Sequence, residues 1–361
     1  MLSNALLFAV GLVTLVIGAE IMVRGASRLA LSCGVSPLVI GLTVVAFGTS
    51  APEMAVSVGA ALDGNPDLAI GNVVGSNIAN VLLILGLSAI IVPLAVAEQI
   101  IRQEIPIMIG ASLLMVVMAL DGHIGSFEAV LLLVLIVAYT VFLIRQSRSA
   151  SREVSDEFAS EIPTSSWDRH WGVQLLLVGG GLALLVLGAN WLVESAVAVA
   201  RALGVSDLVI GLTVVAVGTS MPEIATSIVA AVRGQRDIAV GNVVGSNVFN
   251  ILAVIGATGL VAGGVPVSDA ARNFDLWVML AVAFACVPIM LSGREIARWE
   301  GGVFVAYYAA YMAWLVLTAQ RHEALPSFSG VMLSYVLPIT VVTLVVSLLR
   351  NHPPATPGAE R

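Results

Sequence analysis

The chain contains no lysine, and its 361 residues include only two cysteines and four histidines. Because the basic residues are all arginines and form no basic tract, the sequence excludes a nucleic-acid-binding protein. Cys33 and Cys286 do not form the pattern of a disulfide framework or a metal site, and we interpret them as small packing residues. The histidines fall in predicted loops or in the C-terminal tail, which excludes a histidine-based metalloenzyme within a membrane.

Charge is also scarce. Charged residues make up 11% of the chain and apolar residues 59%, and the mean hydropathy is +1.02. Soluble domains average roughly a quarter charged residues, so the sequence predicts an integral membrane protein whose surroundings are the lipid bilayer. The apolar run at the N-terminus lacks a basic region and a small-residue cleavage site. We therefore interpret it as the first transmembrane helix and not as a signal peptide.

Transmembrane helices need about 20 largely apolar residues, and on this rule the sequence predicts an all-α membrane protein of eleven helices. Clusters of polar residues, glycine and proline separate the helices. The predicted spans are 4–28, 36–62, 68–94, 104–120, 125–145, 171–200, 206–232, 238–263, 273–291, 300–318 and 329–349.

The one long hydrophilic connection divides the chain into two halves of five helices. We expect residues 1–145 to form the first half, 146–170 a cytoplasmic linker, and 171–318 the second half. Since five is odd, the second half must enter the membrane from the opposite face, which makes the halves an inverted-topology repeat. Residues 319–361 would add an eleventh helix, with no counterpart in the repeat, and a tail that we expect to be disordered.

The arginines predict the orientation in the membrane. With the N-terminus outside and the 146–170 linker in the cytoplasm, every arginine except Arg201, Arg272 and Arg321 falls on the cytoplasmic side. The positive-inside rule favours this orientation. The compact, all-arginine chain is compatible with a bacterial inner membrane.

Two stretches, Gly41–Gly86 and Gly211–Gly256, repeat most of their residues at a constant offset of 170. The first part of each reads GTSAPE or GTSMPE and ends at Glu53 or Glu223. The proline should bend or break the helix at this point and release carbonyl oxygens. In the first copy, Thr49 and Ser50 precede Glu53 by four and three residues and should share its helix face, and Thr219 and Ser220 should stand in the same way to Glu223.

The second part of each stretch reads GNVVGSNIAN or GNVVGSNVFN. One helix face should carry Asn72, Ser76 and Asn80, and its copy should carry Asn242, Ser246 and Asn250, because these residues recur every four positions. The glycines Gly71, Gly75, Gly241 and Gly245 would allow close helix packing. Inverted symmetry then brings two glutamates and neutral oxygen donors together near the midplane, which favours a hard cation, Ca²⁺ or Na⁺, over Zn²⁺ or Cu⁺.

A single serine, threonine or asparagine in a membrane helix is usually structural. A carboxylate at mid-membrane costs roughly 2.5–3.5 kcal/mol at the least, so we interpret Glu53 and Glu223 as functional. Glu20 lies in the cytoplasmic half of the first helix, and we expect a local ion pair with Arg24.

With these motifs the two stretches closely resemble the alpha repeats of the sodium/calcium exchanger branch of the Ca²⁺/cation antiporter superfamily, which carry G-T-S-x-P-E followed by G-N-x-x-G-S-N. The resemblance covers about residues 4–318. It implies that Glu53 and Glu223 coordinate the transported ion centrally, and that hydroxyl, carbonyl and amide oxygens complete the calcium and sodium sites. These oxygens would belong to Thr49, Ser50, Thr219, Ser220, Ser76, Ser246, Ala46, Ala216, Asn80 and Asn250.

The sequence departs from some members of that family at Asn250, where several prokaryotic and potassium-dependent relatives carry an aspartate. With two carboxylates in place of three, we expect transport that does not require K⁺ and a central site less able to take up a proton. Two further differences are the eleventh helix, which is outside the ten-helix pattern, and the 146–170 linker, which is too short for a regulatory calcium-binding insertion.

The sequence thus predicts a secondary antiporter that exchanges Na⁺ for Ca²⁺ by alternating access, with the ions as substrates, no cofactor and no obligate protein partner. An H⁺/Ca²⁺ antiporter of the same fold is the alternative. A remoter alternative is an intramembrane hydrolase with paired glutamates, against which stands the lack of a histidine or cysteine partner. A passive channel is disfavoured because inverted repeats with broken helices are typical of transporters.

Overall fold

The computed structural model describes residues 2–161, 170–203, 210, 214 and 216–349, and this part of the chain is almost entirely helical. In the first half the elements are α1 (Leu2–Cys33), α2 (Pro37–Ile40), η1 (Gly41–Val45), α3 (Ala46–Thr49), α4 (Ala51–Leu62), α5 (Pro66–Ala79), η2 (Asn80–Leu85), α6 (Gly86–Ile91), β1 (Leu94–Ala95), η3 (Ile100–Glu104), α7 (Ile105–Met118), η4 (Ala119–Asp121), β2 (His123–Ile124) and α8 (Ser126–Glu161).

The second half repeats this order and adds a C-terminal helix. Its elements are α9 (Trp171–Ala202), α11 (Ala216–Thr219), α12 (Met221–Val232), α13 (Arg236–Phe249), η7 (Asn250–Ile255), α14 (Gly256–Ala262), β3 (Val265–Pro266), η8 (Ala271–Asp275), α15 (Leu276–Leu291), β4 (Glu295–Ile296), α16 (Arg298–Ala319), α17 (Leu325–Val331), η9 (Met332–Val336) and α18 (Leu337–Leu349). The segments η1, η2, η3, η7, η8 and η9 are π-helical.

The predicted spans largely appear as helices. Among the described residues, nine helices are long and apolar enough to cross a membrane, and the pair Pro37–Thr49 and Ala51–Leu62, bent by 42°, makes a tenth. The predicted seventh span, 206–232, begins among residues outside the described ranges and continues as α11 and α12. The all-α prediction is therefore confirmed, with most helix ends shifted by a few residues and α8 longer than predicted.

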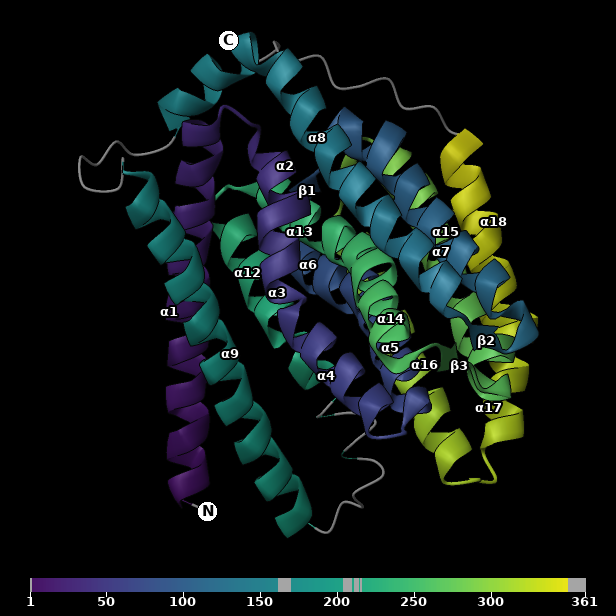
Figure 1. The fold of residues 1–361 in the computed structure, drawn as a ribbon. Coiled ribbons are helices and arrows are strands. Elements are labelled where there is room, and N and C mark those ends of the chain that lie inside the picture. The colour runs from purple at the N-terminus through teal and green to yellow at the C-terminus, as the bar shows by residue number, and fades with distance from the viewer. Residues whose placement is uncertain (1, 162–169, 204–209, 211–213, 215, 350–361) are drawn as a thin grey trace.

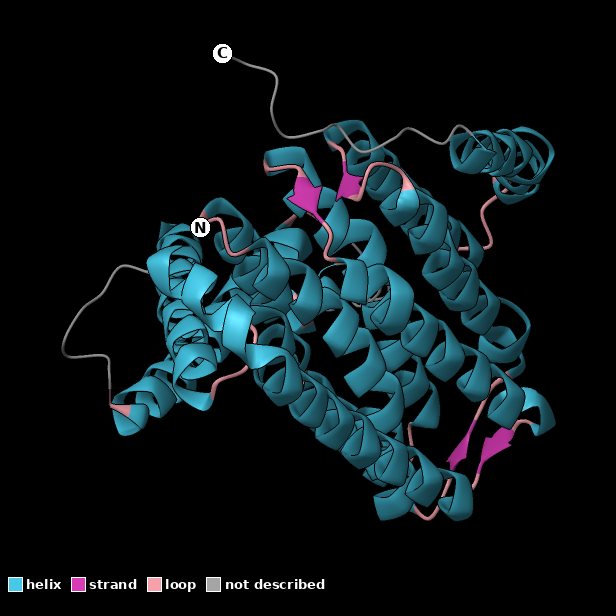
Figure 2. Ribbon diagram, turned by 90° about the horizontal axis from the view of Figure 1, so that it is seen from above, coloured by secondary structure: helices cyan, strands magenta, loops and turns pink. Residues whose placement is uncertain are grey.

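Two pairs of short strands were not predicted. β1 pairs antiparallel with β4, with Leu94 opposite Ile296, and β2 pairs antiparallel with β3, with His123 opposite Pro266. Each pair joins a strand of one half to a strand of the other, and the two pairs lie well apart (Figures 1 and 2). At one face, the segment that follows α6 thus pairs with the segment that precedes α16, which agrees with the inverted arrangement.

The predicted linker is partly helical, because α8 continues as far as Glu161. Arginine, glutamate and serine tolerate a helix, and the first proline of this stretch is Pro163. The remainder of the linker, 162–169, and the predicted disordered tail, 352–361, lie outside the described residues.

At one edge of the molecule α1 and α9 pack along each other (Figure 1). Glycines allow this approach, since a Cβ atom added at Gly181 would lie 2.6 Å from the backbone nitrogen of Met22 and 2.8 Å from the carbonyl oxygen of Gly18. A Cβ atom at Gly188 would lie 2.6 Å from the backbone nitrogen of Leu15. The two backbones are therefore in direct contact, as in small-residue packing of membrane helices.

At the centre of the molecule lies α13, the most buried of the candidate spans. A Cβ atom at Gly245 would lie 2.7 Å from the carbonyl oxygen of Leu42, and one at Gly241 would lie 3.0 Å from that of Leu38. The predicted close packing is thus present at these two glycines, and it brings α13 of the second half against the broken helix of the first half. At Gly71 and Gly75 the prediction is wrong, because no described atom of another element lies within 4 Å of a Cβ atom added there.

Candidate ion-binding site between the halves

Both central glutamates stand in the first turn of a helix that follows a break. Ser50, with φ −80° and ψ 2°, separates α3 from α4, and Ser220, with φ −87° and ψ 8°, separates α11 from α12. Proline follows each serine by two positions, so the new helix begins where a backbone donor is missing. Glu53 and Glu223 are both 0% exposed. The predicted break is present, and it delivers a carboxylate into the protein interior.

Each glutamate meets hydroxyl groups of the opposite half. The Ser220 hydroxyl donates to Oε1 of Glu53 at 3.3 Å, and the Ser76 hydroxyl lies within hydrogen-bonding distance of Ser220, at 3.2 Å. Thr49 and Ser50 lie beside the carboxylate of Glu223. Helical spacing predicts only that Thr49 and Ser50 share a helix face with Glu53. The packing of the two antiparallel halves adds what the spacing does not predict, because Ser220 donates to Glu53 and Thr49 and Ser50 lie beside Glu223.

Two asparagines connect the broken helices across the halves. Asn242 accepts a hydrogen bond from the Thr49 hydroxyl at 3.1 Å, while its Nδ2 donates to the carbonyl oxygen of Glu223 at 3.5 Å. Asn72 does the same in the other half, accepting from Thr219 at 3.4 Å and donating to the carbonyl oxygen of Glu53 at 3.1 Å. Each asparagine thus holds the first turn of the glutamate's helix in its own half and a threonine of the other half.

Four further asparagines meet at the crossing of the two repeats. Nδ2 of Asn80 donates to Oδ1 of Asn247 at 3.0 Å, and Nδ2 of Asn250 donates to Oδ1 of Asn77 at 3.1 Å. The π-helical segments η2 and η7 begin at Asn80 and Asn250. Such π-helical turns often occur at functional sites.

Several oxygen atoms of this region are buried and have no hydrogen-bond partner. Buried polar atoms without a partner are rare in proteins because they lose hydration without compensation. Their number here indicates an arrangement that a cation would complete, since hard cations take oxygen ligands. These atoms are Ser50 Oγ, Glu53 Oε2, Asn80 Oδ1, Glu223 Oε1 and Oε2, Ser246 Oγ and Asn250 Oδ1.

Among the described residues, the site contains two carboxylates, those of Glu53 and Glu223. In the part of the chain that the structure describes, no group of three or more His, Cys, Asp or Glu side chains could hold a metal ion. Two ionised carboxylates buried in one site would repel each other. A divalent cation, or two monovalent cations, would balance this pair together with the neutral oxygens.

The two predicted carbonyl ligands belong to Ala46, at the start of α3, and to Ala216, at the start of α11. The carbonyl oxygen of Ala46 accepts a hydrogen bond from the backbone N–H of Ser50 at 3.0 Å, and the Thr49 hydroxyl, which donates to Asn242, lies 3.4 Å from it. Ala216 begins α11, but its side chain and the preceding turn lie outside the described residues.

Sequence reasoning assigned no role to Asn77 and Asn247, or to Ser57 and Ser227. Ser57 accepts a hydrogen bond from Asn72 at 2.9 Å, and Ser227 accepts one from Asn242 at 3.0 Å. All four residues occur in both copies at the offset of 170. Identity between the copies was thus the signal that could have found them.

Outside the site, Glu20 forms an ion pair with Arg233, at the turn between α12 and α13. We expected a partner one turn along the same helix, Arg24, but the packing of α1 against α12 brings the other half within reach.

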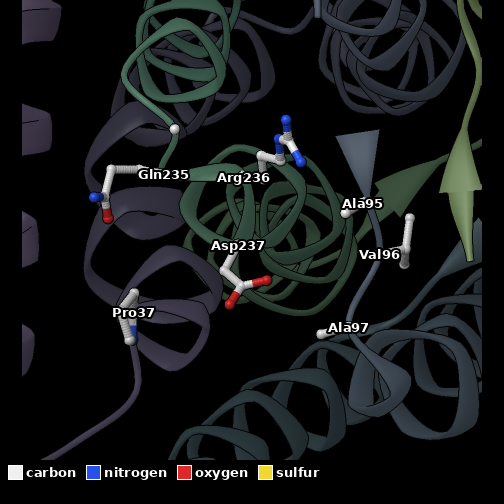
Figure 3. Close-up of a pocket in the computed structure, with 8 residues that line it drawn as sticks. Pro37, Ala95, Val96, Ala97, Gln235, Arg236 and Asp237 are labelled. Atoms are coloured by element: carbon white, nitrogen blue, oxygen red, sulfur yellow. The ribbon is translucent and has the colours of Figure 1, made fainter. Parts of the chain in front are cut away.

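A surface pocket of about 280 Å³ lies beside the same turn (Figure 3). It is lined by Pro37, residues 95–97 and residues 234–237, of which Gln235, Arg236 and Asp237 are polar. None of the predicted site residues lines it, and both central glutamates are closed off from solvent.

Comparison with known proteins agrees with this geometry. The family model described as sodium/calcium exchanger protein matches residues 3–145 and 173–317. CaxA, a candidate antiporter of Alkalimonas amylolytica, is 40% identical over 86% of this chain and 98% of its own length. The sodium/calcium exchanger MaX1 of Methanosarcina acetivorans is 35% identical, also over 86% of this chain and 98% of its own length.

The sodium-calcium exchanger NCX_Mj has a solved structure that superimposes with a TM-score of 0.73 at 32% identity. The match covers 86% of this chain and 98% of that protein. The resemblance inferred from the motifs is confirmed by the family model, by these relatives and by this structure. The chain belongs to the sodium/calcium exchanger protein family.

Proposed function

We propose that the protein is a secondary antiporter that exchanges Na⁺ for Ca²⁺ across the membrane by alternating access. The observation that carries the proposal is the set of buried oxygen atoms without hydrogen-bond partners around Glu53 and Glu223. The names of MaX1 and NCX_Mj, both sodium/calcium exchangers, agree with it.

The charge of the site explains why transport would be an exchange. Two carboxylates buried without a cation are costly in a medium of low dielectric constant. Ca²⁺ or Na⁺ would neutralise them and let the loaded site pass through a closed state, whereas an empty site would be trapped. Glu53 and Glu223 would be the central ligands.

The neutral oxygens would complete the coordination of the ions. Ser50, Ser246, Asn80 and Asn250 supply oxygen atoms that have no other partner. Thr49, Thr219, Ser76 and Ser220 already form hydrogen bonds with other site residues, so they would also hold the site together. The carbonyl groups of Ala46 and Ala216 are proposed ligands by resemblance to the family.

Access to the site would change by movement of α1 and α9 together. Their backbones touch at Gly18 and Gly181, so the two helices form a tight pair at the edge of the molecule. The remaining helices would hold the site while this pair moves across them.

We further propose that transport does not require K⁺, because Asn250 leaves the site with two carboxylates. The protein would lie in a bacterial inner membrane with its N-terminus outside and the 146–170 linker in the cytoplasm, and it would have no catalytic activity.

The experiment that tests the function is Ca²⁺ uptake into proteoliposomes loaded with Na⁺, with Na⁺, K⁺ and pH gradients imposed separately. Glu53→Gln and Glu223→Gln should each abolish Na⁺-dependent uptake. Glu104→Gln is the matched control, because Glu104 is also 0% exposed but its carboxylate accepts hydrogen bonds from Gln99, Gln103 and Tyr139, away from the site.

Normal exchange by the Glu53→Gln, Glu223→Gln double variant would disprove the assignment of the site. Uptake driven by a pH gradient in the absence of Na⁺ would instead identify an H⁺/Ca²⁺ antiporter. Strict dependence on K⁺ would disprove only the role given to Asn250.

A further inference from the structure

Asn77 and Asn247 contact no part of the site's carboxylates, yet each holds one of the proposed amide ligands. We propose that these two residues are positioning residues that fix the side-chain amides of Asn250 and Asn80, so that both Oδ1 atoms face the ion. The inference rests on the proposed function and adds two residues that determine what the site can bind.

The orientation of Asn77 follows from its surroundings. Its Nδ2 lies 3.2 Å from the backbone carbonyl oxygen of Asn247 and 3.6 Å from Sδ of Met279. Neither atom can donate a hydrogen bond. Turning the amide over would therefore set an oxygen against an oxygen. Oδ1 of Asn77 must point the other way, toward Asn250.

This orientation determines that of Asn250. Because Oδ1 of Asn77 only accepts, Asn250 turns its Nδ2 toward it at 3.1 Å. The oxygen of the same amide then points away from Asn77, is buried and has no partner. Asn250 is 0% exposed, so this oxygen has no contact with bulk solvent.

The second copy repeats the arrangement. Nδ2 of Asn247 donates to Sδ of Met108 at 3.3 Å, and a thioether cannot donate in return. Its Oδ1 accepts from Nδ2 of Asn80 at 3.0 Å, and Oδ1 of Asn80 is again buried without a partner. Each positioning residue lies three positions before the amide ligand of its own half but holds that of the other half.

Asparagines between membrane helices often serve only to join them. Joining the helices would not explain why Asn80 and Asn250 both use Nδ2 for the hydrogen bond and both leave Oδ1 without a partner.

The test is a pair of double-mutant cycles in equilibrium binding of radioactive Ca²⁺ to the purified full-length protein in detergent, repeated for Ca²⁺ uptake in proteoliposomes. We expect Asn77→Ala to weaken Ca²⁺ binding about tenfold, the equivalent of one buried hydrogen bond. In an Asn250→Ala background the same change should have less than a twofold effect. In an Asn80→Ala background it should keep its tenfold effect.

Asn247→Ala should show the reverse pattern, with its effect lost only in the Asn80→Ala background. Should Asn77→Ala fail to fold, Met279→Leu removes only the sulfur that helps to hold Asn77, and we expect a two- to threefold loss that also disappears in Asn250→Ala. For Asn247 the corresponding change is Met108→Leu.

Equal effects of Asn77→Ala in all backgrounds, or no effect in any, would overturn the inference and show a structural role. The proposed function fails separately, if the wild-type protein does not couple Ca²⁺ uptake to Na⁺, because the binding cycles do not depend on the coupled ion. Absence of Ca²⁺ binding by the wild-type protein would overturn both.

Discussion

Replacing Gly181 by alanine should separate α1 from α9. The added Cβ atom would lie 2.6 Å from the backbone nitrogen of Met22 and 2.8 Å from both the Met22 Cα and the Gly18 carbonyl oxygen. Ordinary contacts of a Cβ atom begin at 3.4 Å, and all the opposing atoms are backbone, so no side chain can turn aside. One helix must move by most of an ångström.

The cost can be set against a control on the same helix. Forcing an extra methyl group into a packed interface costs about 1–3 kcal/mol. Alanine also favours a helix over glycine by about 1 kcal/mol, and Gly180→Ala should show this gain alone, because Gly180 is exposed and no described atom lies within 4 Å of its added Cβ. Because both variants gain the higher helix propensity of alanine, they should differ by the packing cost alone, about 1–3 kcal/mol in the free energy of unfolding.

Thermal unfolding of each variant in detergent, followed by intrinsic tryptophan fluorescence, measures this difference as a shift of several degrees in the midpoint. Gly188→Ala should behave like Gly181→Ala, since its Cβ atom would meet the backbone of Leu15 at 2.6 Å. Equal midpoints for Gly181→Ala and Gly180→Ala would refute the conclusion that the backbones of α1 and α9 are in contact.

Three further predictions concern stability. Tyr139→Phe removes the hydroxyl that donates to Oε2 of Glu104 at 2.8 Å and should destabilise the protein by about 1–3 kcal/mol in chemical denaturation; Tyr308→Phe, at a buried tyrosine without such a bond, should change little, and equal losses would count against the role of Glu104. Glu20→Gln breaks the ion pair with Arg233. Both side chains are about half exposed, so the free energy of unfolding should fall by at most about 1 kcal/mol, and a larger loss would contradict the assignment of a surface ion pair. Ca²⁺ at 100 times its Kd should stabilise the protein by about 2.7 kcal/mol relative to a chelator, as measured by the unfolding midpoint; the same stabilisation in the Glu53→Gln, Glu223→Gln double variant would place the Ca²⁺ elsewhere.

The sequence was sufficient for the helices and for the broken segments. Long apolar runs predict spans because the bilayer leaves few alternatives, and Pro52 predicts the break that the structure shows at Ser50. The two glutamates could be found in the same way, since a carboxylate in an apolar run is costly unless it has a role.

Contacts between the halves could not be read in this way. Helical spacing relates Ser50 to Glu53 within one segment, but it cannot reveal that Ser220 of the other half reaches Glu53 instead. Helical spacing also cannot reveal the hydrogen bond that Asn77 accepts from Asn250. Such pairs depend on how two antiparallel segments cross, which is a property of tertiary packing.

The two strand pairs restrict how the protein can change shape. The pair β1–β4, with Leu94 opposite Ile296, joins the halves at one face, and the pair β2–β3, with His123 opposite Pro266, joins them at the other. If one rigid half rocked against the other, one of the two strand pairs would have to separate and lose its backbone hydrogen bonds. Neither strand pair includes residues of α1 or α9. The proposed movement of α1 and α9 would leave both strand pairs intact, so the two halves could keep their relative position while access to the site changes.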